Sequence, residues 1–230
     1  LKAVEVEKKT SLGRREYIEG KLFGHDVVLV FSQWGKTAAA STTANLINVF
    51  GIDRLVFTGV AGGLDSNARI GDIVVAKRLY HHDVDASPFK PRYFVPLVGP
   101  DGVEADAETS DALALAAQAF VKDMGKYISV ENMNEFSLSH VKVHRKNIAT
   151  GDQFVKTDAV RGRIMADLPD MYAVEMEGAA VCQVAAGYKI PVLSVRAISN
   201  NERKDGAYAP ETAAICARFV MAVIAEYGRI

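Results

Sequence analysis

The stretch YAVEMEGAAVCQVAAGYKIPVLSVRAISN, residues 172–200, reads as a strand, a helix and a second strand. Tyr172–Val174 is short and apolar, and the alanine-rich segment Gly178–Tyr188 favours a helix. Val192–Ile198 is a largely apolar run, which is typical of a strand buried on both faces of a sheet. This order of elements predicts an α/β fold.

The same alternation extends outward in both directions. The pattern predicts further strands at Glu16–Leu22 and Asp26–Ser32, which form a hairpin, and at Leu55–Thr58, Ile73–Lys77 and His140–Ala149. It predicts helices at Gly35–Phe50, Ser110–Met124 and Pro210–Tyr227. We therefore expect a three-layer α/β fold in which helices flank a central mixed, mostly parallel β-sheet.

Composition indicates a globular domain without a polyanionic partner. The 230 residues fit one domain, and 49% hydrophobic with 24% charged residues is typical of a soluble globular protein. The formal net charge is -1 and no block of like charge occurs, so neither nucleic acid nor an acidic membrane is an expected partner. Cys182 and Cys216 lie amid alanine and valine, which predicts two buried free thiols in a reducing compartment. We expect a cytoplasmic location.

Ligands of α/β folds bind at the carboxyl ends of strands, which directs attention to three segments. These are Thr58–Gly63, Val174–Glu177 and Ile198–Asn200. The glycines of the first segment either let the backbone approach a ligand or form an ordinary tight turn. Spacing alone favours the turn.

Two carboxylates stand between a buried strand and an alanine-rich helix. Glu177 is placed to accept hydrogen bonds from two sugar hydroxyls and to stabilise positive charge on a ribose. The alternative is that Glu177 complements the positive N-terminus of the helix. Glu175 is expected to be a supporting group or a surface residue.

Polar residues also interrupt the apolar strand near residue 198. Arg196 needs an anionic or hydrogen-bonding partner if it is buried, and Glu177 is a candidate. Asn200 suits reading the edge of a heterocycle or, alternatively, forming a turn. Phe154 either stacks on a base or belongs to the core. His81-His82-Asp83 does not predict a metal site, because adjacent side chains point apart and no further His or Cys spacing supports one.

Six motifs together resemble the nucleoside phosphorylase/nucleosidase superfamily, and within it the 5′-methylthioadenosine/S-adenosylhomocysteine nucleosidases. They are TGVAGGL (58–64), GDIVVA (71–76), HDVDASPF (82–89), TGDQFV (150–155), AVEMEGAA (173–180) and VRAISN (195–200). The resemblance covers roughly residues 30 to 225 and implies hydrolysis of the bond between N9 of adenine and C1′ of a 5′-thioribose. It implies no cofactor and no metal.

The resemblance also implies roles for individual residues around the ribose. Glu177 would bind the ribose hydroxyls and stabilise an oxocarbenium-like transition state. The backbone of Met176 would lie against the sugar, and Arg196 would hold the attacking water and Glu177.

Further implied roles concern the base and the 5′-substituent. Phe154 would stack on the purine, the Val155 backbone would read its edge, and the Ala61-Gly62 backbone would line the pocket. Three residues would surround the 5′-substituent, and one of them, Phe89, would reach it from the partner subunit of a homodimer. The three are Trp34, Phe89 and Tyr208.

Four departures from the family pattern bear on the substrate. Asn200 stands where the family has an aspartate that protonates N7, and asparagine cannot supply that proton. It resembles the residue of 6-oxopurine-specific relatives, including futalosine hydrolases, while Asp205 lies in a nearby loop. Val60 replaces a small polar residue, and Gln33-Trp34 replaces a pair of small residues.

The fourth departure lies at the N-terminus. We expect that the family's first β-strand, with the glutamate that activates water, precedes Leu1, so that residues 1–230 form a single domain without that strand. Glu5 and Glu7 lie beyond the position of that glutamate.

Three hypotheses follow. The first is a hydrolase of methylthioadenosine or adenosylhomocysteine, the second is a hydrolase of a 6-oxopurine nucleoside, and the third is a purine-nucleoside-binding protein without catalysis. Hydrolysis is favoured over phosphorolysis because no cluster of arginines accompanies the glycine-rich segment. HDVDASPF favours the first hypothesis.

Overall fold

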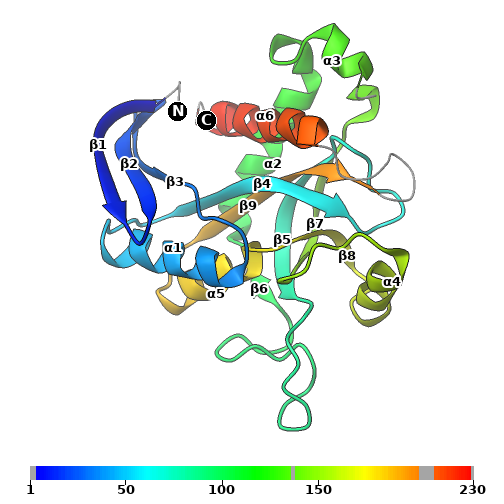
Figure 1. Ribbon diagram of the computed structural model, residues 1–230. Helices are drawn as coiled ribbons and strands as arrows, with labels where there is room; N and C mark the ends of the chain where they lie inside the picture. The colour runs from blue at the N-terminus through cyan, green and yellow to red at the C-terminus, as the bar shows by residue number, and fades with distance from the viewer. Residues whose placement is uncertain (1–3, 136–137, 202–209, 229–230) are drawn as a thin grey trace.

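A computed structural model describes residues 4–135, 138–201 and 210–228 of the chain. The first three strands form a separate antiparallel sheet in the order β1-β2-β3 (Figure 1). Its strands are β1 (Val4–Leu12), β2 (Arg15–Leu22) and β3 (His25–Val30). The predicted hairpin is confirmed, because Leu22 pairs with His25 across the turn Phe23-Gly24. Both turn residues have positive φ, as a tight hairpin turn requires. Strand β1 was not predicted.

The main sheet has the strand order β6-β5-β7-β8-β4-β9, and β5 also pairs with β9. Its strands are β4 (Leu55–Gly63), β5 (Ile73–His81), β6 (Val103–Glu104), β7 (Val143–Thr150), β8 (Met171–Glu175) and β9 (Val192–Asn200). The sheet is mixed, as predicted. The parallel pairings β4–β9, β5–β7 and β7–β8 extend over more residues than the antiparallel pairings β4–β8, β5–β6 and β5–β9.

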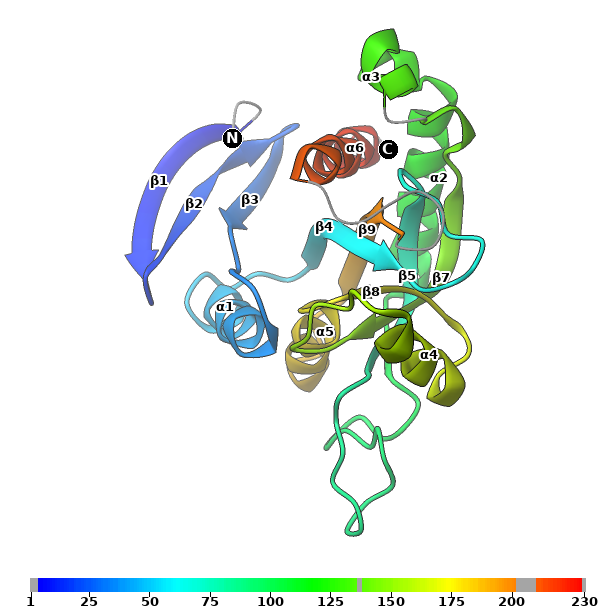
Figure 2. The same cartoon turned by 45° about the vertical axis from the view of Figure 1, so that its right-hand side comes forward.

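Helices cover the main sheet as two packed pairs, which lie apart in both views (Figures 1 and 2). One pair is α1 (Lys36–Asn48) with α5 (Gly178–Gly187), and the other is α2 (Ala107–Lys122) with α6 (Pro210–Tyr227). Alternate residues of β5 enter different hydrophobic clusters: Val74 and Ala76 enter one, and Ile73 and Val75 the other. The sheet is therefore buried between two apolar layers.

Several boundaries differ from the prediction. The glycine-rich segment after Thr58 is not a turn, because β4 continues to Gly63 and pairs there with both β8 and β9. Strands β5 and β9 likewise continue to His81 and Asn200. Helices α3 (Val130–Glu135) and α4 (Asp158–Asp167) were not predicted, and neither was β6. Helix α6 begins and ends where the sequence predicts.

The long connection between β5 and β6 projects away from the body of the molecule (Figures 1 and 2). It contains the HDVDASPF motif at its start. Of the residues that the structure describes, no helix is both long and apolar enough to cross a membrane.

Candidate active site

The ends of four strands of the main sheet lie side by side. Gly62 at the end of β4 pairs with Val174 of β8 and with Asn200 of β9. Thr150 at the end of β7 pairs with Glu175 of β8. The sheet therefore gathers the strand ends that the sequence singled out at one place.

Glu175 is buried at this place and has four hydrogen-bond donors. Its Oε2 accepts from Arg196 Nη2 at 2.5 Å and from the backbone N–H groups of Glu177 and Gly178 at 3.0 and 2.7 Å. Its Oε1 accepts from the hydroxyl of Thr150. A surface position for Glu175, one of the two expectations, is wrong. Glu175 also satisfies the N–H groups at the start of α5, the task considered for Glu177.

Arg196 pairs with Glu175 rather than with the predicted partner Glu177. Its Nη2 lies 2.5 Å from Glu175 Oε2 but 3.9 Å from Glu177 Oε2. The guanidinium also stacks over the ring of Phe57, 4.3 Å from its centroid. Arg196 and Glu175 are both buried, and each charge needs the other as compensation.

Gly59 makes room for the guanidinium of Arg196. A Cβ atom at position 59 would lie 2.1 Å from Arg196 Nη1, closer than two non-bonded atoms can approach. Similarly, a Cβ at Gly62 would lie 3.3 Å from Asn200 Nδ2. The small residues of the TGVAGGL segment thus accommodate neighbouring side chains of β9.

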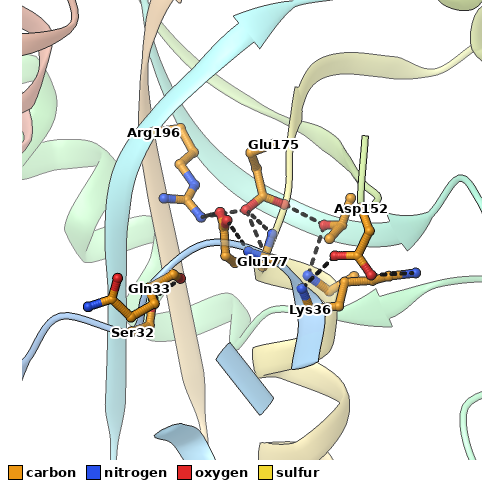
Figure 3. Close-up of polar contacts among 11 residues, drawn as sticks. Ser32, Gln33, Lys36, Asp152, Glu175, Glu177 and Arg196 are labelled. Carbon is orange, nitrogen blue, oxygen red and sulfur yellow. Dashed lines mark hydrogen bonds and ion pairs between the residues drawn. The ribbon is translucent and has the colours of Figure 1, made fainter. Parts of the chain in front are cut away.

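Glu177 stands at the start of α5 with its side chain 14% exposed (Figure 3). Its Oε1 accepts a hydrogen bond from the backbone N–H of Gly35 at 2.9 Å, just before α1. Burial and the charge of Glu175 raise the pKa of Glu177, while the Gly35 hydrogen bond and Arg196 oppose this rise. Glu177 makes no side-chain cap of α5, so its carboxylate is not occupied by the helix.

The start of α1 is tied to the segment that follows β7 (Figure 3). The backbone N–H of Lys36 donates to Asp152 Oδ1 at 2.8 Å. Lys36 Nζ donates to Asp83 Oδ1 at 2.6 Å, and the backbone N–H of Asp152 donates to Asp83 Oδ2 at 2.8 Å. No role was predicted for Lys36, Asp83 or Asp152, although Asp83 stands in HDVDASPF and Asp152 in TGDQFV.

Asn200 is buried at the end of β9. Its Oδ1 accepts from the hydroxyl of Ser199 at 3.2 Å. The amide lies beside Gly62 of β4, where an added Cβ would be 3.3 Å from Nδ2 and 3.5 Å from Oδ1 of Asn200.

The remaining predicted residues fall into three groups. Ala61 and Val155 are buried, while Gly62 and Met176 are partly buried. Three aromatic side chains are exposed in the single chain: Trp34 by 83%, Phe89 by 89% and Phe154 by 49%. Tyr208 and Asp205 lie outside the described residues.

The histidines at the end of β5 are buried. His81 Nε2 lies 3.1 Å from Gln183 Oε1. Burial lowers the pKa of both His81 and His82, so both rings are neutral at pH 7. Across residues 4–135, 138–201 and 210–228, no three His, Cys, Asp or Glu side chains are grouped to hold a metal ion.

Comparison with known proteins agrees with this architecture. The family model of the phosphorylase superfamily matches residues 1–227. A 5′-methylthioadenosine/S-adenosylhomocysteine nucleosidase of Shewanella denitrificans is 36% identical over 200 residues, which are 83% of this chain and 75% of the relative.

Two solved structures extend the likeness. A nucleosidase of the same name from Colwellia psychrerythraea, crystallised with adenine, has a TM-score of 0.78 and 31% identity, covering 99% of this chain and 88% of the other. Futalosine hydrolase of Helicobacter pylori has a TM-score of 0.75 and 27% identity, covering 98% and 87%. On its sequence and its fold, the chain belongs to the phosphorylase superfamily, in the family of the 5′-methylthioadenosine/S-adenosylhomocysteine nucleosidases.

Proposed function

We propose that this chain hydrolyses the N-glycosidic bond of 5′-methylthioadenosine and S-adenosylhomocysteine, releasing adenine and the thioribose. The observation that carries this proposal is the environment of Glu177. Its carboxylate is largely buried at the strand ends, accepts a hydrogen bond from the backbone N–H of Gly35, and does not cap the helix behind it. The names of the relatives agree with this substrate class.

Glu177 acts on the ribose in the proposed reaction. A carboxylate accepts hydrogen bonds from two adjacent hydroxyls, and its charge stabilises the positive charge that develops on the sugar as the bond to the base breaks. Arg196 is already neutralised by Glu175. Its charge therefore does not cancel that of Glu177, which stays available to the transition state.

The base occupies the neighbouring space in this proposal. Phe154 stacks on the purine, the backbone of Val155 reads its edge, and the backbone of Ala61 and Gly62 lines the pocket. The half-exposed ring of Phe154 and the partial burial of Gly62 are compatible with these roles.

Asn200 supports a second candidate substrate, a 6-oxopurine nucleoside such as futalosine. Its Oδ1 accepts from Ser199, and the NH2 group then donates to N7 or to a 6-oxo group. A neutral amide cannot protonate N7 of adenine. The similarity to a futalosine hydrolase adds to this candidate, and the closer sequence relatives favour the first.

The 5′-substituent is covered by aromatic residues in a homodimer of single-domain protomers. Trp34 and Phe89 are almost fully exposed in the single chain, and Phe89 stands on the projecting β5–β6 connection. In the dimer Phe89 reaches the site of the partner protomer, while Trp34 and Tyr208 complete the 5′ pocket of their own chain.

Base release with and without phosphate tests the proposal. We expect adenine from methylthioadenosine, at equal rates in both conditions. Hypoxanthine from inosine-type nucleosides in place of adenine would favour the second candidate, and purine binding without release would favour a binding protein.

Replacing Asn200 with aspartate separates the two substrates further. Asp supplies a proton to N7, so Asn200→Asp should raise the rate on adenine nucleosides if that proton limits the rate. In this variant the Ser199 hydroxyl still donates to residue 200. The control is Ser199→Ala, which removes that donor and leaves Asn200 in place. No gain in Asn200→Asp would mean that another group donates the proton.

A further inference from the structure

Asp83 joins three segments that are distant in the sequence. It follows the end of β5, and its Oδ1 accepts from Lys36 Nζ of α1 at 2.6 Å. Its Oδ2 accepts from the backbone N–H of Asp152, after β7, at 2.8 Å. Each carboxylate oxygen therefore has one donor from a different element.

The residues held by Asp83 are in turn connected to Glu177. The backbone N–H of Lys36 donates to Asp152 Oδ1 at 2.8 Å, and the adjacent N–H of Gly35 donates to Glu177 Oε1 at 2.9 Å. Two successive backbone N–H groups at the start of α1 thus serve two carboxylates.

Gly35 lies against Asp152 and directly precedes Lys36, whose backbone N–H donates to Asp152. Its backbone has φ 87° and ψ 158°, a conformation found almost only in glycine. A Cβ atom at this position would lie 3.0 Å from Asp152 Oδ1. A shift of Asp152 or of Lys36 would therefore carry the Gly35 N–H away from Glu177.

We propose that Asp83 is a positioning residue of the hydrolytic reaction, which fixes Lys36 and Asp152 and through them holds the Gly35 N–H against Glu177. The same contact fixes the start of the 152–155 segment that carries Phe154. This inference rests on the proposed function, in which Glu177 acts on the ribose. Asp83 itself does not touch the ribose.

The charges around Glu177 give the expected pH effect. The charged groups beside Glu177 are Glu175 of β8 and Arg196 of β9. The Gly35 N–H, just before α1, donates to its carboxylate. His81 at the end of β5 is neutral because burial lowers its pKa. Burial and Glu175 raise the pKa of Glu177, and the Gly35 hydrogen bond opposes them. Loss of that bond should raise the pKa further. The acid limb of kcat/KM, where Glu177 becomes protonated, should then move to higher pH.

The experiment compares Asp83→Ala with Asp83→Asn and with a matched control. The control, Asp111→Asn, removes a carboxylate outside the site. Asp111 Oδ1 lies 3.1 Å from Arg145 Nε. For Asp83→Ala we expect kcat to fall on the order of 10²-fold, with a smaller change in KM. Asp83→Asn keeps one acceptor oxygen and should retain more activity. Asp111→Asn should match the wild type.

The pH profile distinguishes positioning from simple loss of folded enzyme. A smaller folded fraction lowers the whole profile without moving its limbs, whereas loss of the Gly35 contact moves the acid limb. If the profiles of both Asp83 variants coincide with that of the wild type after scaling, the proposal is overturned.

Amide hydrogen exchange tests the same connection without turnover. Gly35 and Lys36 should lose protection in Asp83→Ala and in Asp83→Asn, while the amides of α6 keep theirs. Unchanged protection at residues 35 and 36 overturns the proposal. If the wild type releases no purine, the proposed function fails, and the exchange measurement still decides whether Asp83 holds the start of α1.

Discussion

The buried cluster of Thr150, Glu175 and Arg196 differs sharply from the outer aromatic residues Trp34 and Phe89. In the buried cluster, Glu175 accepts from both other side chains and neutralises Arg196. The two outer aromatic residues are 83% and 89% exposed. One region is therefore complete within a single chain, and the other presents apolar surface to its surroundings.

This contrast follows from what burial requires of polar and of apolar side chains. Buried charges must be compensated for the chain to fold at all, so the polar groups that support Glu177 are fixed by folding. Exposed aromatic rings mark a surface that a partner or a ligand can cover. In the proposed function, the reaction at the ribose takes place in the buried region, and the exposed aromatic residues recognise the 5′-substituent.

Replacing Glu177 should produce the largest effect on turnover. Glu177→Gln keeps the shape of the side chain but removes its charge, so kcat should fall about 10³-fold. Steady-state kinetics on methylthioadenosine, if adenine release is established, measures this loss. A kcat within tenfold of the wild type would remove Glu177 from the reaction.

The same variant should gain stability at neutral pH. Because the pKa of Glu177 is raised above its ordinary value of 4.5, the folded state favours the protonated carboxyl. The stabilisation from that preference is present below pH 4.5 and is lost as pH rises through the higher folded pKa. Glu177→Gln should therefore melt above the wild type at pH 7, and the gap should close near pH 4. Equal melting temperatures at both pH values would contradict the raised pKa.

Replacing Glu175 should mainly affect folding. Glu175→Ala leaves Arg196 buried without its partner, which costs about 3–5 kcal/mol of the free energy of unfolding. Chemical denaturation measures this change. The comparison with Glu177→Gln, only two residues away, separates the carboxylate that supports the fold from the one proposed to act on the ribose. A stable Glu175→Ala with full activity would contradict the division.

Packing around Arg196 should give an intermediate effect. Gly59→Ala forces a methyl group against Nη1 and should cost about 1–3 kcal/mol of unfolding free energy. Gly162→Ala in α4 is the matched control, because nothing lies within 4 Å of an added Cβ there and alanine favours helices by up to about 1 kcal/mol. The free energy of unfolding, measured by denaturation, should therefore fall for Gly59→Ala and rise for Gly162→Ala. Equal shifts would mean that Gly59 does not make room for the guanidinium.

The sequence predicted the strand–helix alternation, because buried strands and alanine-rich helices have clear local patterns. It did not predict that β4 continues through its glycines, because pairing with β9 and the space needed by Arg196 are tertiary facts. The unpredicted β1 is polar and mostly exposed, so it lacks the apolar run that identifies a buried strand.

The sequence singles out residues of the candidate site more readily than it predicts their contacts. Glu177 and Asn200 stand just after or at the end of a strand, and Arg196 is a charge inside an apolar strand, so simple rules direct attention to them. The sequence predicts Glu177 as the partner of Arg196, whereas the structure pairs Arg196 with Glu175. Spacing along the chain does not show which of the two carboxylates is buried beside the guanidinium. The role of Asp83 was hidden for a similar reason, because its partners are 47 and 69 residues away in the chain.

The outer aromatic residues should give the smallest effect and the sharpest test of the surface side of the comparison. Phe89→Ala removes a ring proposed to cover the substrate of the partner protomer, so KM for methylthioadenosine should rise roughly 10-fold, in keeping with about 1.5 kcal/mol for burial of a phenylalanine ring. Leu97→Ala is the control, because Leu97 is fully exposed on the same projecting connection and has no proposed contact with substrate. The rise in KM for Phe89→Ala should be present in the dimer and absent for a substrate without a 5′-substituent. An equal rise for Leu97→Ala would indicate that the connection acts only through its overall conformation, and the ring of Phe89 would then have no part in recognition.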